Sequence, residues 1–443
     1  MDRIELLEPL LQGGIRNTNF FNGRLLSAED LRTEQTAARR QRAQLGRAAG
    51  AGVVAGLEVT RGDAGGGAAT VNVAAGLAVN EAGQALELPG AMQVALVRAP
   101  QAAGGPAELF KPCERQATTA TLVAGDGVYV LALTPASGFA ERAPASGLGG
   151  NPLTSPGCGS RYAVEGVQFR LVKLDLNTNA WITAETRARL AVLTGADDAA
   201  SLSRLRNLLA HLCYGDDRPA DFTRDPFRPD FTNLPAAQYG ALDALRAQGA
   251  LTACDVPLAL LYWTGTGVRF VDAWAVRRGP VAPGASGRWA VFGGARRARE
   301  AEASFYQFAE QLRETREREQ NLETLSAAQF FESLPPVGLL PATGVGGAPG
   351  FNPQNFFAGQ LPRRATYIHG AQVEPLVRTA LAYAPINLRE RNVVWLYRVV
   401  DGATSVRPYY VFTSAHVPYA AGARFDIDRY NFGNFAYEPA LPS

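Results

Sequence analysis

Glycine and proline are the residues that most constrain how this chain can fold. The sequence contains 46 glycines and 28 prolines among 443 residues, about one position in six. Both residues interrupt regular structure and favour turns, glycine through its free backbone and proline through its fixed φ angle. We therefore expect many short strands joined by turns and loops, and few long helices.

Between residues 69 and 97, apolar side chains recur at every second position within short runs. These positions are Val71, Val73, Leu77, Val79, Leu86, Leu88, Val94 and Leu96. An alternation of period two is typical of antiparallel strands that bury one face. With further strands expected at 127–135 and 164–176, the pattern predicts an antiparallel β-sandwich-like domain that ends near residue 178.

A polar helix is expected before these strands, from about residue 28 to residue 48. Ser27 precedes Glu29 and Asp30, which is typical of a helix N-terminus, where acidic side chains face the positive end of the helix dipole. Few residues of this helix are apolar, chiefly Leu31 and Leu45. Either it is solvated over most of its surface, or it packs against another subunit through small and polar contacts.

By composition, the chain divides into a first domain and three further parts. The polar helix and the β-sandwich are expected to form one N-terminal domain, residues 1–178. Residues 179–333 are expected to form a middle region, with helical segments and a hairpin around the turn 264–267. Residues 334–362, rich in proline and glycine, are expected to be a linker, and residues 363–443 a small α+β C-terminal domain with an aromatic tail. The predicted fold class is α+β and rich in β-structure.

Aromatic residues are densest near the C-terminus. The candidate aromatic surface consists of Tyr419, Phe425, Tyr430, Phe432, Phe435 and Tyr437. Aromatic side chains fill β cores, anchor protein interfaces and stack on sugars. This stretch is therefore expected to be packed core, an interface between subunits or a ligand-binding surface.

The charge and the N-terminus exclude several classes of function. The formal net charge is +2, and such a balanced chain gives no electrostatic reason to bind nucleic acid. Residues 1–12 lack the basic and then apolar pattern of a signal peptide, and no stretch approaches about 18 uninterrupted apolar residues. We expect the protein to be made in the cytoplasm without a cleaved signal.

No residue pattern indicates catalysis, a cofactor or a metal. The histidines His211, His369 and His416 are far apart, and the H-E-x-x-H, G-x-S-x-G and phosphate-loop motifs are absent. The cysteine spacing fits no zinc site, and the apolar segments around Cys213 and Cys254 indicate buried free thiols. We therefore predict no catalytic residues, no metal and no cofactor. A hydrolase with an unrecognised site is a further alternative.

Several segments carry a resemblance to a known group of proteins. Residues 19–31 read NFFNGRLLSAEDL, 52–59 read GVVAGLEV, 71–80 read VNVAAGLAVN, 254–259 read CDVPLA and 334–338 read LPPVG. The sequence resembles structural proteins associated with phage-tail-like contractile injection systems. The sharpest part of the resemblance covers about 70 residues at the N-terminus.

The resemblance implies a non-enzymatic structural subunit at the baseplate or fibre end of such a particle. Its N-terminal module would dock on other baseplate or tail subunits. The candidate docking residues are Phe20, Phe21, Arg24, Glu29, Asp30, Glu34, Arg39 and Arg40. The C-terminal domain would face a cell surface, a membrane complex or another subunit. The layout is also similar to the trimeric baseplate adaptor of type VI secretion, which favours a homotrimer. The alternative is a carbohydrate- or cell-surface-binding module.

Overall fold

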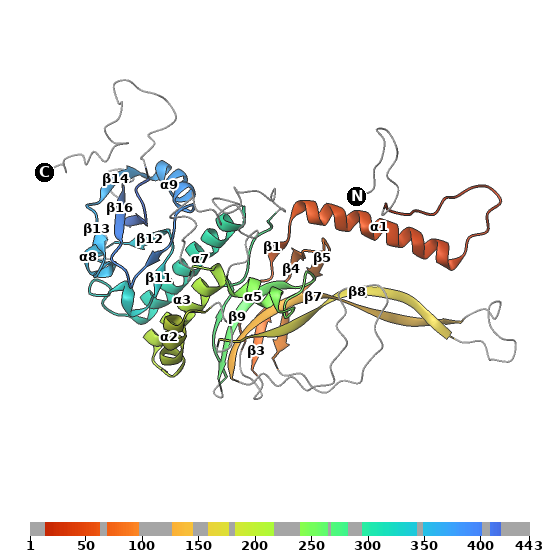
Figure 1. Cartoon of the computed structure of the whole chain (residues 1–443), viewed down its shortest axis with the longest axis horizontal. Helices are drawn as coiled ribbons and strands as arrows, with labels where there is room; N and C mark the ends of the chain where they lie inside the picture. The colour runs from red at the N-terminus through yellow and green to blue at the C-terminus, as the bar shows by residue number, and fades with distance from the viewer. Residues whose placement is uncertain are drawn as a thin grey trace, which may run out of the picture.

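The structure is a computed structural model of the chain. It describes residues 14–62, 69–96, 126–144, 158–176, 182–216, 240–264, 267–281, 295–342, 349–400 and 408–417. Helices and antiparallel sheets contribute in similar measure, so the prediction of an α+β fold rich in β-structure is confirmed. Figure 1 shows a body from which one helix and one β-ribbon project to the right.

Three sheets build the N-terminal half. Its strands are β1 (Gly52–Gly56), β2 (Val59–Arg61), β3 (Thr70–Val73), β4 (Gly76–Val79), β5 (Ala85–Leu88), β6 (Met92–Ala95), β7 (Gly127–Pro144), β8 (Cys158–Leu174), β9 (Val256–Thr264) and β10 (Gly267–Asp272). The strand orders are β1–β4–β5, β2–β3–β6 and β10–β9–β7–β8. Side chains of all three sheets, among them Val53, Val71 and Leu258, share one core. This is the sandwich-like packing that the alternating pattern predicted.

The four-stranded sheet is covered on both faces. Odd-numbered residues of the run 129–133 in β7 lie in the sandwich core, whereas even-numbered residues of the run 128–132 lie in a second core. Helices cover this second face, namely α2 (Ala184–Thr194), α3 (Ala199–Tyr214) and α5 (Ala241–Ala247). Successive side chains of a strand point to opposite faces, so a doubly covered strand needs an uninterrupted apolar run.

A five-stranded sheet organises the C-terminal half. Its elements are α7 (Ala295–Arg318), η4 (Ala327–Gln329), β11 (Ser333–Leu334), β12 (Val337–Pro341), α8 (Pro353–Phe356), β13 (Leu361–Pro362), β14 (Thr366–His369), η5 (Gly370–Gln372), α9 (Val373–Ala380), β15 (Ile386–Asn387), β16 (Val393–Val400) and β17 (Tyr409–Thr413). β12, β17 and β16 are antiparallel neighbours, and β13 and β14 run parallel to β16. On one face, Leu376 of α9 shares a core with Tyr397. On the other, Phe308, Phe331, Phe351, Phe356, Phe357 and Phe412 form an aromatic core.

The predicted domain boundaries are wrong at three places. β7 pairs with β9, so one sheet crosses the boundary expected at residue 178. α7 contributes Phe308 to the C-terminal core, which crosses the boundary expected at residue 333. The described parts of the expected linker, residues 334–342 and 349–362, belong to the C-terminal half, because β12 pairs with β17 and Phe351 is buried. Proline and glycine density indicated a linker, but distant partners build this segment into the fold.

A buried polar cluster joins the two halves. The guanidinium of Arg206 in α3 bonds Asp272 of β10 at 2.7 Å and Glu314 of α7 at 2.8 Å. Glu310 lies 3.4 Å from the same guanidinium. Burial alone would lower the pKa of Arg206, but Asp272, Glu314 and Glu310 together raise it above its ordinary value. The arginine therefore stays charged, and one buried cation fixes α3, β10 and α7 to one another.

Beside this cluster, α3 is bonded to the segment that enters the C-terminal sheet. The side-chain oxygen of Asn207 accepts hydrogen bonds from the backbone N–H groups of Glu332 at 2.8 Å and Ser333 at 2.9 Å. The carboxylate of Glu332 is paired with Arg204 at 2.6 Å and also with Arg189. Since Glu332 is buried, its two arginine partners offset the cost of removing its charge from water.

We expect Asp272→Asn to lower the free energy of unfolding by about 3 kcal/mol, because removing one partner of a buried ion pair costs about 3–5 kcal/mol. Glu317→Gln is the matched control. Glu317 pairs with Arg313 on the exposed surface, and its loss should change stability by less than about 0.5 kcal/mol. Chemical denaturation of the full chain measures both variants, and equal effects would contradict the role given to the buried cluster.

Candidate functional site

An arm made of residues 14–27 and helix α1 (Ala28–Ala49) projects from the body (Figure 1). With 22 residues, the helix is about 33 Å long. The Ser27 hydroxyl accepts a hydrogen bond from the backbone N–H of Asp30 at 3.1 Å, and the Asp30 carboxylate accepts one from the N–H of Ser27 at 3.0 Å. The bond from the Ser27 N–H and a second one from the Ser27 hydroxyl to the same carboxylate lower the pKa of Asp30. The capping box confirms the predicted helix start.

Side chains before the cap hold the outer end of the arm together. Arg24 is paired with Asp30, and its guanidinium carbon lies 5.8 Å from the centroid of the Phe21 ring. The Thr18 hydroxyl donates to the carbonyl of Asp30 at 2.8 Å, and the Thr18 backbone N–H donates to the Glu34 carboxylate at 3.4 Å. The segment before the helix is therefore bonded to the first two turns of α1.

Two glycines fix the base of the arm. Gly46 in α1 meets Gly83 in the turn between β4 and β5, backbone against backbone. A Cβ on Gly46 would lie 2.1 Å from the carbonyl oxygen of Gly83, and a Cβ on Gly83 would lie 1.9 Å from the carbonyl oxygen of Ala43. Gly83 also has a φ of +84°, in the left-handed region that favours glycine. No larger residue fits at this contact without moving α1.

A β-ribbon runs beside the arm (Figure 1). β9 pairs with β7 only as far as Leu133, whereas β8 pairs with β7 as far as Pro144. An ion pair between Arg39 and Glu165, 3.0 Å long, links α1 to the ribbon. Sequence reasoning missed the ribbon, because its outer part is rich in glycine, alanine and serine and shows little apolar alternation.

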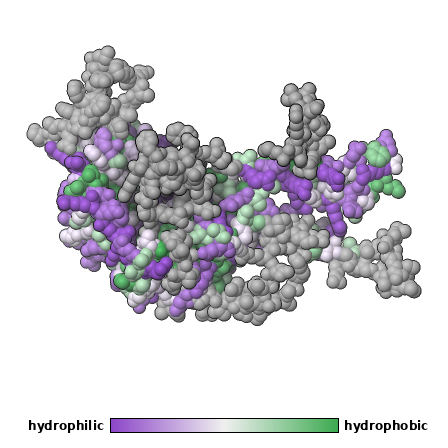
Figure 2. All heavy atoms as spheres, in the orientation of Figure 1, coloured by the Kyte–Doolittle hydropathy of each residue, from purple (hydrophilic) through white to green (hydrophobic). Residues whose placement is uncertain are grey.

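The arm carries the largest group of exposed apolar side chains in the described part of the chain. Phe20, Phe21, Leu25, Leu26, Leu31 and Leu45 are 52–94% exposed. Figure 2 shows hydrophobic residues gathered at the outer end of the arm and hydrophilic ones along much of α1. The ribbon adds Phe139, Tyr162 and Val164, whose exposure the sequence did not indicate.

All eight predicted docking residues lie on this arm, and what they bind stays a prediction. Phe20, Phe21, Glu29 and Arg40 are exposed, Arg24, Asp30 and Glu34 bond within the outer end, and Arg39 reaches the ribbon. The second predicted surface, made of Tyr419, Phe425, Tyr430, Phe432, Phe435 and Tyr437, lies outside the described residues.

The C-terminal sheet carries a row of two tyrosines and an arginine. Tyr367 of β14, Arg398 of β16 and Tyr410 of β17 are directly opposed in register. The guanidinium carbon lies 5.9 Å from the centroid of the Tyr367 ring and 6.0 Å from that of the Tyr410 ring. All three side chains are half-buried. The rings hold the cation between them, a contact that stabilises the sheet.

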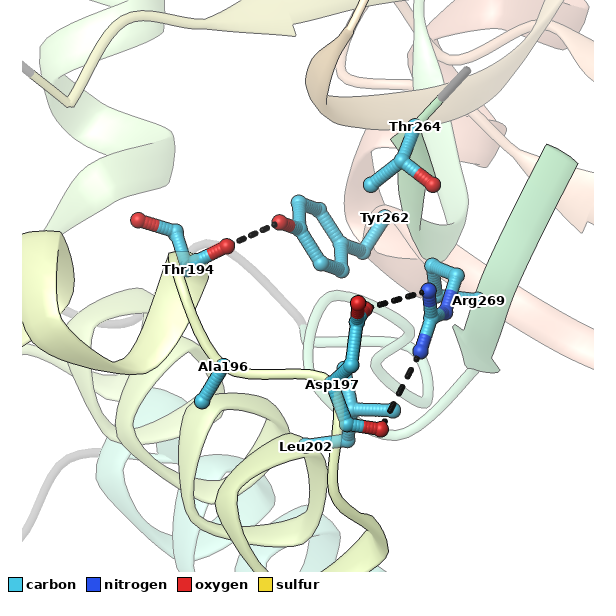
Figure 3. Close-up of a pocket in the computed structure, with 7 residues that line it drawn as sticks. All are labelled: Thr194, Ala196, Asp197, Leu202, Tyr262, Thr264 and Arg269. Carbon is cyan, nitrogen blue, oxygen red and sulfur yellow. Dashed lines mark hydrogen bonds and ion pairs between the residues drawn. The ribbon is translucent and has the colours of Figure 1, made fainter. Parts of the chain in front are cut away.

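A small pocket of about 210 Å³ lies between the α2–α3 turn and the β9–β10 hairpin (Figure 3). It is lined by Thr194, Ala196, Asp197, Leu202, Tyr262, Thr264 and Arg269. The Tyr262 hydroxyl donates to the carbonyl of Thr194 at 3.2 Å, and Arg269 pairs with Asp197 at 2.8 Å. Burial raises the pKa of Tyr262, so its hydroxyl keeps its proton. These groups bond one another across the pocket, which favours a structural role over a substrate site.

The groups that carry chemistry are dispersed. Within the described ranges, no three or more His, Cys, Asp or Glu side chains are placed to hold a metal ion. His211 bonds Asp216 at 2.8 Å, far along the chain from the other two histidines. Cys213 is a buried free thiol, as predicted, and burial raises its pKa to about 12. Cys254 is disulfide-bonded, so the prediction of a free thiol there is wrong, because sequence spacing does not reveal which cysteines meet in space.

No helix in the described part of the chain is both long and apolar enough to cross a bilayer. No protein-family model and no curated protein matches the chain. The arm, with its exposed apolar side chains and the ribbon beside it, is therefore the candidate site on structural grounds.

We expect Gly46→Ala to loosen α1 from the body, although alanine is the better helix former by about 1 kcal/mol. The added Cβ would meet the carbonyl oxygen of Gly83, so amide hydrogen exchange should become faster in α1 and in the turn 80–83. Gln44→Ala, at an exposed site of the same helix, should leave this protection unchanged or raise it. Unchanged or greater protection of α1 in Gly46→Ala would rule out the contact as the anchor of the arm.

Proposed function

We propose that the chain is a non-enzymatic structural subunit at the baseplate or fibre end of a phage-tail-like contractile injection particle. The observation that carries this proposal is the concentration of exposed apolar side chains on a projecting arm. Of fourteen exposed large apolar side chains among the described residues, six lie between residues 20 and 45 and three on the ribbon. Single exposed apolar residues are ordinary, whereas a cluster of them is typical of a surface that binds a partner.

The arm is built to dock without rearranging. Its base is fixed by the contact between Gly46 and Gly83, and its outer end by the capping box and the pair of Arg24 with Asp30. A preformed surface loses little conformational entropy when it binds. Aromatic and arginine side chains are enriched in interface cores, which supports Phe20, Phe21 and Arg24 as contact residues for other baseplate or tail subunits.

The C-terminal sheet lies at the end of the molecule opposite to the arm (Figure 1). Docking through the arm would therefore leave the C-terminal half pointing away from the docking surface. In this proposal it meets a cell surface, a membrane complex or another subunit. The resemblance in the sequence favours several copies of the chain in each particle.

A carbohydrate-binding module is the second candidate, favoured by the row of Tyr367, Arg398 and Tyr410. Aromatic rings beside a fixed cation suit an acidic sugar. The Arg398 guanidinium already lies against both tyrosine rings, which leaves less aromatic surface for a sugar to stack on. Selective binding of the full chain to acidic glycans on an array, lost in Arg398→Ala, would favour this candidate.

The test of the proposed function is co-purification. A tagged full-length chain is recovered from the cells that naturally make it, and the material is imaged by electron microscopy. We expect sheathed, tail-like particles. The variant Phe20→Ser, Phe21→Ser, Leu25→Ser should stay folded but separate from them, because its substitutions remove the apolar end of the arm.

Val192→Ser is the control, because Val192 is 73% exposed on α2, away from the arm. It should stay with the particles. If the tagged chain purifies without particles, the assignment to a particle is wrong. If the triple variant remains attached, the docking role of the arm is wrong.

A further inference from the structure

The outer edge of β8 has no strand partner among the described residues. β8 is the last strand in the order β10–β9–β7–β8. Beyond Leu133 of β7, the sheet narrows to two strands, residues 134–144 and residues 158–168. Eleven residues of strand span about 36 Å. A two-stranded ribbon is marginally stable alone, and an open edge offers a row of unpaired N–H and C=O groups to another strand.

The exposed part of β8 is self-complementary. Residues 160–166 are all exposed and read SRYAVEG. If a second copy of β8 pairs antiparallel with the first, with Ala163 on the two-fold axis, Arg161 lies opposite Glu165 of the second copy and Tyr162 opposite Val164. Opposite charges, and an aromatic ring facing a β-branched side chain, are favourable cross-strand pairs.

Other registers lack this match. When a two-fold axis relates two identical antiparallel strands, the N–H and C=O groups of the two facing edges meet only if the axis lies at a residue and not between two residues. An axis at Arg161 or at Glu165 would place like charges opposite each other. An axis at residue 162 or 164 would place one of these charges opposite Ala163. Among the five residues 161–165, only Ala163 gives opposite charges in both symmetry-related positions.

The ion pairs already present would be extended rather than broken. Glu165 is bonded to Arg39 at 3.0 Å, and Arg161 to Glu141 at 3.1 Å. In the paired arrangement, positive and negative side chains alternate along one row, in the order Arg39, Glu165, Arg161 of the second copy and Glu141 of the second copy. All these side chains are partly exposed, and a network is a better use of exposed charges than isolated pairs.

We propose that two copies of this chain associate through antiparallel pairing of their β8 edges about Ala163. This inference goes beyond the proposed function and does not depend on it, because it uses the edge of the ribbon rather than the apolar end of the arm. The contact is isologous and joins copies in twos. A trimer, which the resemblance favours, would need a different contact.

The experiment uses purified full-length protein in sedimentation velocity across micromolar concentrations. We expect the natural chain to sediment as a dimer of its 47.2 kDa monomer. Arg161→Glu and Glu165→Arg each place like charges opposite each other in two symmetry-related positions. Each should weaken the dimer at least about tenfold. The double variant Arg161→Glu, Glu165→Arg restores both opposite-charge pairs and should dimerise again.

Mixing the two single variants separates pairing from internal damage. One copy then carries glutamate at both positions of the natural charge pair, and the other carries arginine at both, so a heterodimer has both pairs matched. The mixture should dimerise although neither variant does so alone. Arg313→Glu is the control for the change in charge, because Arg313 is exposed on α7, and it should not affect the dimer.

Several outcomes would overturn the proposal. The first is a natural chain that stays monomeric, and the second is a single charge-reversal variant that dimerises as well as the natural chain. The third is that neither the double variant nor the mixture forms dimers, although both show the thermal unfolding transition of a folded protein. A concentration-dependent trimer indifferent to all these changes would also overturn it, and would point to another surface.

Discussion

The contact between the Arg206 guanidinium and the Asp272 carboxylate is the interaction on which the arrangement of the molecule depends. Arg206 comes from the helical layer, Asp272 from the four-stranded sheet, and Glu314 from the helix that enters the C-terminal core. A buried charge without a partner costs several kcal/mol, roughly the margin by which a domain is stable. These three elements therefore cannot shift relative to one another without losing the fold, and the sheet that continues into the ribbon is held in one orientation.

The arm is stabilised in a different way. Inside the body, both faces of β7 are buried, and the C-terminal sheet is packed on both sides. Along α1, Ala37 is the buried residue among those described. The orientation of α1 comes from the backbone contact at Gly46 and from the ion pair of Arg39 with Glu165. Hydrophobic burial therefore fixes the body, while the arm keeps its apolar side chains in contact with water and available to a partner.

The sequence predicts those features that depend on neighbouring residues. Ser27 with Asp30 marks the helix start, and the hairpin around 264–267 follows from its glycines. Features that depend on distant partners were missed. A local signal was missed as well, because Gly195 ends α2 and Asp198 caps α3, and these residues divide the helical part of the middle region. The ion-pair role of Arg206 has no local signal, since an arginine among leucines is also typical of a helix that faces water at one position.

The two-fold pairing of β8 has a consequence for the arms. Glu165 lies two residues from Ala163, so the two copies of Glu165 would be four residues apart along the paired strands, about 13 Å. Arg39 holds α1 over this glutamate, and a helix with its side chains is about 10–12 Å wide. The two α1 helices would therefore both lie near the two-fold axis. The apolar residues before the helix, at its far end, would still be free to dock.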